Sequence, residues 1–179
     1  MNVFLIIDMQ VGLFQGENAR HDKDGVVRRI NEVARAVRAH DGRVIFVQHN
    51  GKSGDDTEQG TKGWQLLPEL DRADHDIIVT KTACDSFYES MLPQILDGLN
   101  PKRLIIGGCA TDFCVDTTVR AAASRDYEVT VVSDGHTTAT RPYADASTII
   151  IHHNWVWENL ELPHSKVRVI TSNKIIQGL

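Results

Sequence analysis

The chain has 179 residues, of which 24 are acidic and 19 are lysine or arginine, and its formal net charge is -5. This length is sufficient for one sizeable hydrophobic core and predicts a single domain over residues 1–179. The charges are spread along the chain without a basic run, and apolar runs such as 3–7 are too short to cross a membrane. We therefore expect neither a nucleic acid nor a membrane as a partner.

The cysteine content bears on the cellular compartment. The chain holds three cysteines, Cys84, Cys109 and Cys114, and its first residues lack the features of a secretory signal. An odd number of cysteines in such a chain favours free thiols over a disulfide framework. The sequence therefore predicts a cytoplasmic protein.

Apolar runs alternate with helical patterns from the start of the chain. The run at 3–7 predicts a strand that ends at Asp8, and apolar residues at helical spacing then predict a helix over 23–40. A second strand at 43–47 precedes a polar segment, 50–63, whose Gly, Asp, Thr and Ser residues are typical of an exposed loop.

The same alternation continues to the end of the chain. Further strands are predicted at 77–79, 104–106, 128–132 and 167–170, and further helices at 90–99, 112–125 and 143–157. Strands that alternate with helices favour a parallel sheet that is covered on both faces. The sequence predicts an α/β protein with a three-layer Rossmann-like fold, in which a six-stranded, mostly parallel sheet carries helices on both faces.

Reactive residue types fall where predicted strands end. Asp8 follows the first strand, Lys81 follows the third, and Cys114 lies in the first turn of a helix after a tight turn at Gly107 and Gly108. A thiol at a helix start is expected to favour its thiolate, because it lies at the positive end of the helix dipole. With a carboxylate as base and an ammonium group nearby, the thiol has what nucleophilic acyl chemistry requires. Backbone N–H groups near Ala110 and Cys114 are candidates to bind the oxyanion.

Each of these residues also has an ordinary structural explanation. An aspartate after a strand is commonly a turn or capping residue, and a lysine is commonly solvated. Cys84, Cys109 and Cys114 are all small enough to serve as buried apolar residues. The occurrence of the three residue types at one predicted sheet edge favours the functional explanation.

Three motifs, in order along the chain, carry a resemblance to a known family. They are residues 5–10 (LIIDMQ), residues 79–81 (VTK) followed by Ser86 and Phe87, and residues 107–115 (GGCATDFCV). Together they resemble the isochorismatase-like cysteine hydrolase superfamily, which includes nicotinamidases and N-carbamoylsarcosine amidohydrolases. The resemblance implies a catalytic triad of Asp8, Lys81 and Cys114. It also implies a cis peptide between Cys109 and Ala110 that directs the Ala110 N–H at the oxyanion, beside the N–H of Cys114.

Two departures from the family pattern narrow the expected chemistry. Nicotinamidases carry an Asp-x-His metal motif after the second strand, whereas here no aspartate lies two residues before His49, so we expect no metal and no other cofactor. Isochorismatases that cleave a vinyl ether lack the nucleophilic cysteine, which is present here as Cys114. The expected activity is metal-independent hydrolysis of a C–N bond in a small amide through a thioester.

The predicted pocket and assembly rest on weaker patterns. Phe14, His49, Trp64 and Phe87 are predicted to bind substrate; the alternative places Phe14 and Phe87 in the core and Trp64 at a subunit interface. The resemblance implies a homodimer or larger homo-oligomer. Trp155 and Trp157, near the end of the predicted helix 143–157, are candidates to face a partner subunit. His136 is predicted to cap a loop rather than to reach the active site. His152 and His153 are predicted to pack in the core or at an interface rather than to bind a metal ion.

Other functions remain open from the sequence. The chain is also compatible with an isochorismatase-type ether hydrolase, a nicotinamidase, or a family member that binds a metabolite without turnover. Thiol redox chemistry through Cys109 and Cys114 is a further alternative, although their spacing is not the usual Cys-x-x-Cys.

Overall fold

A six-stranded sheet forms the centre of the computed structural model, which describes residues 1–16 and 19–179. Its strands are β1 (Asn2–Ile7), β2 (Arg43–His49), β3 (Ile77–Lys81), β4 (Arg103–Cys109), β5 (Val129–Thr137) and β6 (Val167–Ile170). They are arranged in the order β3-β2-β1-β4-β5-β6, and every neighbouring pair is parallel. The predicted α/β fold class is confirmed.

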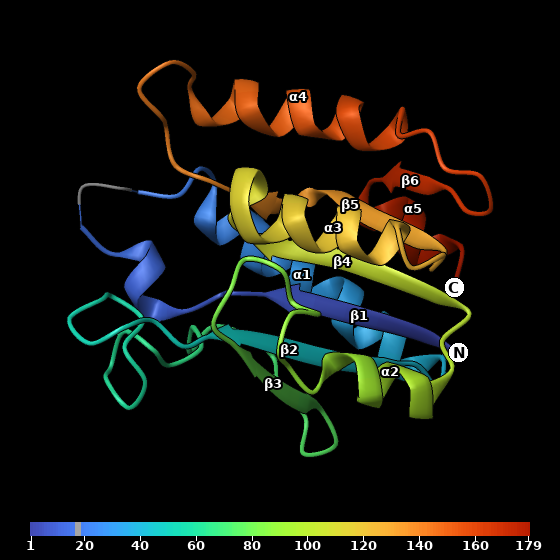
Figure 1. Cartoon of the computed structure of the whole chain (residues 1–179), viewed down its shortest axis with the longest axis horizontal. Coiled ribbons are helices and arrows are strands. Elements are labelled where there is room, and N and C mark those ends of the chain that lie inside the picture. Colours follow the sequence, from blue (N-terminus) through green and yellow to red (C-terminus); the bar gives the residue numbers. More distant parts are fainter. Residues whose placement is uncertain (17–18) are drawn as a thin grey trace.

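Helices cover both faces of the sheet (Figure 1). They are the 3-10 turn η1 (Val11–Phe14), α1 (Lys23–Ala39), α2 (Leu92–Leu99), the π-helical turn η2 (Thr111–Val115), α3 (Asp116–Ala123), α4 (Ala146–Glu158) and α5 (Ser172–Gln177). The helices α1 and α5 pack on one face, and α2, α3 and α4 contribute to the core on the other. None of these helices is both long and apolar enough to cross a bilayer.

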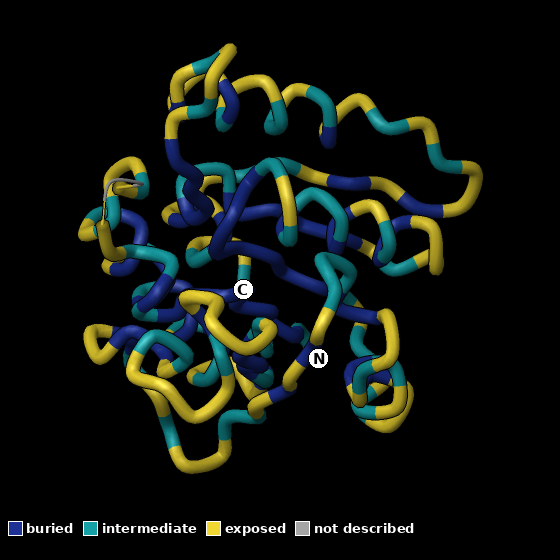
Figure 2. The backbone as a smooth tube through the Cα atoms, turned by 60° about the vertical axis from the view of Figure 1, so that its left-hand side comes forward, coloured by how far each residue is buried: buried dark blue, intermediate teal, exposed yellow. Residues whose placement is uncertain are grey.

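Strand β1 shows why the sheet forms two cores. Val3, Leu5 and Ile7 point into the core under α2 and α3, whereas Phe4 and Ile6 point into the core under α1. All five side chains are fully buried, because successive residues of a strand face opposite sides of the sheet. The backbone drawn in Figure 2 is accordingly buried along the central strands and exposed in the outer loops.

The glycine pair before Cys109 lies in a strand, so the predicted tight turn is wrong. Gly108 pairs with Ile7 of β1 and has a φ of +124°, and a Cβ there would collide with the carbonyl oxygen of Ile7. A Cβ at Gly107 would lie 2.6 Å from the carbonyl oxygen of Gly135. The two glycines therefore permit close backbone approach on both sides of β4.

Several predicted boundaries also change. Strand β5 was expected to end near residue 132, but after a register shift against β4 it continues to Thr137, which adds His136 opposite Gly108. A π-helical turn precedes α3, and the segment after β6, for which the sequence predicted no element, forms α5. Hydrogen bonds between distant segments decide these boundaries, and local sequence patterns do not report them.

Candidate active site

The carboxyl edge of the sheet brings Asp8 and Lys81 together. Asp8 follows β1 with a φ of 46°, Lys81 ends β3, and β2 lies between these two strands. Strands two positions apart are about 9–10 Å apart, so only a long side chain can bridge them. The Nζ of Lys81 lies 2.7 Å from Oδ2 of Asp8 and donates to the carbonyl oxygen of Ala83 at 2.9 Å.

This ion pair is fully buried. The side chains of Lys81 and Asp8 are 0% and 1% exposed. Burial by itself would lower the pKa of Lys81, but the negative charge of Asp8 and its hydrogen bond to the ammonium group act against burial and raise the pKa. Lys81 is therefore a permanent cation at neutral pH.

Cys114 lies in the π-helical turn that leads into α3, on the cavity that also contains Asp8. Burial, and then the negative charge of Asp8, raise the pKa of Cys114 well above its ordinary value. Desolvation and the neighbouring carboxylate thus act against the thiolate that the helix start is expected to favour. Within the described residues, Oδ1 of Asp8 has no hydrogen-bond partner. One carboxylate oxygen thus remains to accept a proton.

The peptide between Cys109 and Ala110 is cis, and both residues line the same cavity. The carbonyl oxygen of Ala110 accepts hydrogen bonds from the N–H groups of Phe113, at 3.0 Å, and Val115, at 3.1 Å. Burial raises the pKa of Cys109 to about 12, so its thiol stays protonated at neutral pH. This protonation disfavours the redox alternative, which requires a second reactive thiol.

A cavity of about 400 Å³ opens above these groups. This volume lies within the range of small-molecule sites. Of the four residues predicted to bind substrate, His49 lines the cavity. Burial, followed by the charge of Lys81, lowers the pKa of His49, so this histidine is neutral at pH 7.

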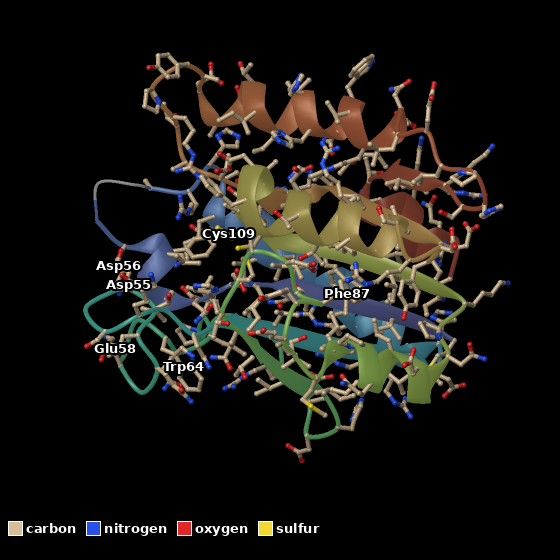
Figure 3. The ribbon with its side chains drawn as sticks, viewed as in Figure 1. Asp55, Asp56, Glu58, Trp64, Phe87 and Cys109 are labelled. Carbon is tan, nitrogen blue, oxygen red and sulfur yellow. The ribbon has the colours of Figure 1, made fainter. Side chains whose placement is uncertain are left out.

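The other three predicted pocket residues, Phe14, Trp64 and Phe87, are not among the described residues that line the cavity. Phe87 is 4% exposed in the core, where its ring stacks on Tyr127, and Figure 3 shows it well away from Cys109. Phe14 packs against the core under α1, and Nε1 of Trp64 donates to Oδ1 of Asn50 at 2.7 Å. Aromatic side chains suit a core as well as a pocket, so the sequence pattern did not separate the two environments.

Gln10 is a structural residue of the site that the sequence analysis missed. Its buried side chain donates to the carbonyl oxygens of His49 and Trp64, each at 3.0 Å, and accepts from the N–H of His49 at 2.8 Å. It therefore joins the end of β2 to the loop that follows. Its position two residues after Asp8 in the first motif was the available signal.

The cavity also contains residues for which the sequence predicted no role, among them Arg20, Phe113 and Arg141. Arg141 donates to both carboxylate oxygens of Asp112, at 2.8 and 3.2 Å, and its guanidinium lies 4.9 Å from the centre of the Phe113 ring. Burial would raise the pKa of Asp112, but hydrogen bonds from Arg141 and Thr138 outweigh it and lower the pKa. This ion pair holds the turn that carries Cys114 against the loop after β5.

His136 supports the same turn from inside the protein. Its Nδ1 lies 2.9 Å from Oγ1 of Thr111, its Nε2 lies 2.9 Å from Oδ1 of Asn154, and its ring meets Trp157 edge-on. Burial lowers the pKa of His136 to about 4. It is thus a neutral core residue rather than the predicted loop cap. Nδ1 of His153 lies 2.8 Å from the carbonyl oxygen of Ile149, one turn earlier in α4.

The lowered pKa of His136 predicts a loss of stability in acid. Between pH 6.5 and pH 4 the unfolded chain binds a proton that the folded protein does not. The stabilisation by His136 is present above pH 6.5 and is lost as the pH falls towards 4, by about 3 kcal/mol in total. Urea unfolding at pH 7, 6, 5 and 4 should show the wild-type advantage over His136→Gln shrinking by about this amount. A constant difference across these pH values would contradict the assignment.

A parallel sheet with a thiol, a carboxylate and an ammonium group beside one cavity defines an α/β protein equipped for chemistry on a small molecule. A family model described as "Isochorismatase domain" matches residues 2–157. A crystal structure of an isochorismatase family protein superposes with a TM-score of 0.84 at 28% identity and covers 93% of this chain and 96% of that one. The chain belongs to the isochorismatase family of hydrolases.

Two curated relatives carry hydrolase names. Streptothricin hydrolase of Streptomyces noursei is 28% identical over 144 residues, covering 80% of this chain and 57% of that protein. Ureidoacrylate amidohydrolase RutB of Cronobacter sakazakii is 30% identical over 89 residues, covering 49% of this chain and 38% of that protein. The chain thus spans about half of the streptothricin hydrolase and a smaller share of RutB.

Proposed function

We propose that this chain hydrolyses the C–N bond of a small amide through a thioester on Cys114. The observation that carries the proposal is the position of Cys114 and Asp8 on one cavity, with Lys81 bound to Asp8 beneath it. The amidohydrolase name of one relative supports the choice of a C–N bond. The resting thiol is protonated, so the reaction needs a base, and Asp8 is the carboxylate in position.

In the proposed first half-reaction, Oδ1 of Asp8 accepts the thiol proton while the sulfur of Cys114 attacks the amide carbon. The N–H groups of Ala110 and Cys114 stabilise the oxyanion that forms. The C–N bond then breaks as Asp8 returns the proton to the leaving nitrogen. Lys81 keeps its charge throughout and stabilises the ionised Asp8 before and after the transfer.

The second half-reaction restores the enzyme. Asp8 accepts a proton from a water molecule, which attacks the thioester carbon. The C–S bond breaks, the thiol of Cys114 is protonated again, and a carboxylic acid leaves. The net reaction adds water across the C–N bond, and no redox step is involved.

A panel of primary amides, nicotinamide included, tests this proposal through ammonia release. We expect at least one amide to be turned over, with the Cys114→Ala variant as the blank. A folded wild-type protein that releases no ammonia, and whose Cys114 does not react with iodoacetamide at neutral pH, would favour a non-catalytic binding protein instead.

We expect the activity to need no metal. Among residues 1–16 and 19–179, no group of three or more His, Cys, Asp or Glu side chains is arranged to hold a metal ion. Ammonia release after treatment with EDTA and desalting should stay within about twofold of the untreated rate, because the proposed reaction uses no protein-bound metal ion that EDTA could remove. A loss of activity that zinc restores would contradict the metal-independent mechanism.

A further inference from the structure

Arg20 lies in the candidate active site, and two of its guanidinium nitrogen atoms have no hydrogen-bond partner among the described residues. It lines the cavity, and its Nε and Nη1 atoms are shielded from solvent. Neither atom has a hydrogen-bond partner among the residues that the structure describes. Shielding charged donors without an acceptor is costly, so these two donors indicate an acceptor supplied by a ligand.

The other two cations near the site are already neutralised. Lys81 is paired with Asp8 at 2.7 Å, and Arg141 is held by both oxygens of Asp112. Arg20, in contrast, forms no ion pair within the described part of the chain. Among the residues that the structure describes, Arg20 therefore brings one positive charge to the cavity without a counterion.

Charges of both signs surround the cavity. Arg20 and Arg141 act on Cys109 together with Asp8 and Asp112, whereas Lys81, Asp8 and Asp55 act on His49. Figure 3 shows Asp55 and Asp56 together in the outer loop, apart from Cys109. Both aspartates are exposed, so solvent and salt screen their repulsion of an anion at the inner wall.

We propose that the substrate amide carries a carboxylate, and that Arg20 binds this carboxylate beside Cys114. The inference rests on the proposed amide hydrolysis and adds the substrate class to it. A single uncompensated guanidinium matches the single negative charge of a carboxylate and can donate two hydrogen bonds to it. A phosphate dianion would require a second free cation, and the cavity of about 400 Å³ suits a short monoamide of a dicarboxylic acid.

Binding can be measured without turnover in the Cys114→Ala background. The charged probes are malonamate, succinamate and glutaramate, which cover a range of distances between the guanidinium of Arg20 and Cys114. The uncharged probes are the diamides of the same three acids. Isothermal titration calorimetry compares four proteins. One is the single variant Cys114→Ala, and the other three add Arg20→Gln, Arg20→Lys or Arg28→Gln to it. Arg28 is the matched control, because its side chain lies on α1 and is 62% exposed.

We expect at least one acid monoamide to bind more tightly than its diamide, and Arg20→Gln to weaken its binding by about 10- to 100-fold. Arg20→Lys should recover part of this loss, and Arg28→Gln should change the affinity by less than about twofold. Equal affinity with and without Arg20→Gln, preference for the diamides, or no binding of any monoamide would overturn the assignment.

Kinetics separate this inference from the proposed function. If both hold, Arg20→Gln raises KM for the acid monoamide about 10-fold or more, and by more than it raises KM for neutral amides, whereas Arg28→Gln leaves both within about twofold. Turnover of neutral amides alone would retain the proposed function and overturn the carboxylate subsite. Calorimetric binding that depends on Arg20, without turnover of any amide, would retain the subsite and overturn the hydrolase.

Discussion

Replacing Cys114 with alanine should lower amide hydrolysis by at least about 10³-fold, because removal of a catalytic nucleophile costs this much or more in comparable enzymes. The thiol of Cys114 lies on the cavity and combines a nucleophilic sulfur with the neighbouring carboxylate of Asp8. Ammonia release under saturating substrate measures the effect. Circular dichroism and urea unfolding should remain close to those of the wild type, because the side chain is only partly buried.

A neighbouring substitution provides the control for this experiment. Thr117 lies in the next turn, outside the cavity, and its hydroxyl donates to the carbonyl oxygen of Phe113 at 2.8 Å. Thr117→Ala should keep activity within about threefold of the wild type, because an exposed hydrogen bond of this kind contributes little. Substantial hydrolysis by a folded Cys114→Ala variant would remove the thioester mechanism.

Breaking the buried ion pair should have the largest effect on stability. Lys81→Met leaves the Asp8 carboxylate uncompensated at 1% exposure, and we expect the free energy of unfolding to fall by about 3–5 kcal/mol. Asp8→Asn leaves a buried ammonium group and should cost a similar amount. Urea unfolding at pH 7 measures both, and both variants should also lose hydrolysis.

The double variant Asp8→Asn/Lys81→Met separates stability from catalysis. Removing both charges removes the uncompensated charge, so most of the lost stability should return while hydrolysis stays absent. The exposed pair Lys23–Glu69 is the control, since Lys23→Met should cost less than about 1 kcal/mol. Losses that simply add in the double variant would show that Asp8 and Lys81 do not stabilise each other.

These expectations assign different tasks to the two ends of the site. The ion pair between Asp8 and Lys81 lies at the sheet edge and contributes, after burial, to the pKa shifts of Cys114 and His49. The ion pair between Arg141 and Asp112 and the network of His136 hold the turn of Cys114 from either side. Arg20 is left to contact what enters the cavity.

The sequence by itself determined the layered fold, and it placed Asp8 and Lys81 at the ends of strands. Alternating apolar strands and amphipathic helices have few stable solutions other than a covered parallel sheet. Strands of such a sheet end at one edge, so Asp8 and Lys81 had to lie near each other. This inference needs only the strand ends, which the apolar runs marked to within two or three residues, with β5 as the exception.

Only the tertiary structure decided the burial of Cys114 beside Asp8, the strand conformation of Gly108, the core position of Phe87 and the place of Arg20 in the cavity. Each depends on groups far away in the chain. Desolvation of Cys114 depends on everything packed around it, and Gly108 is required by the backbone of β1. An arginine in a loop has the same local pattern whether it faces solvent or a ligand, so only the packing of distant segments separates the two environments.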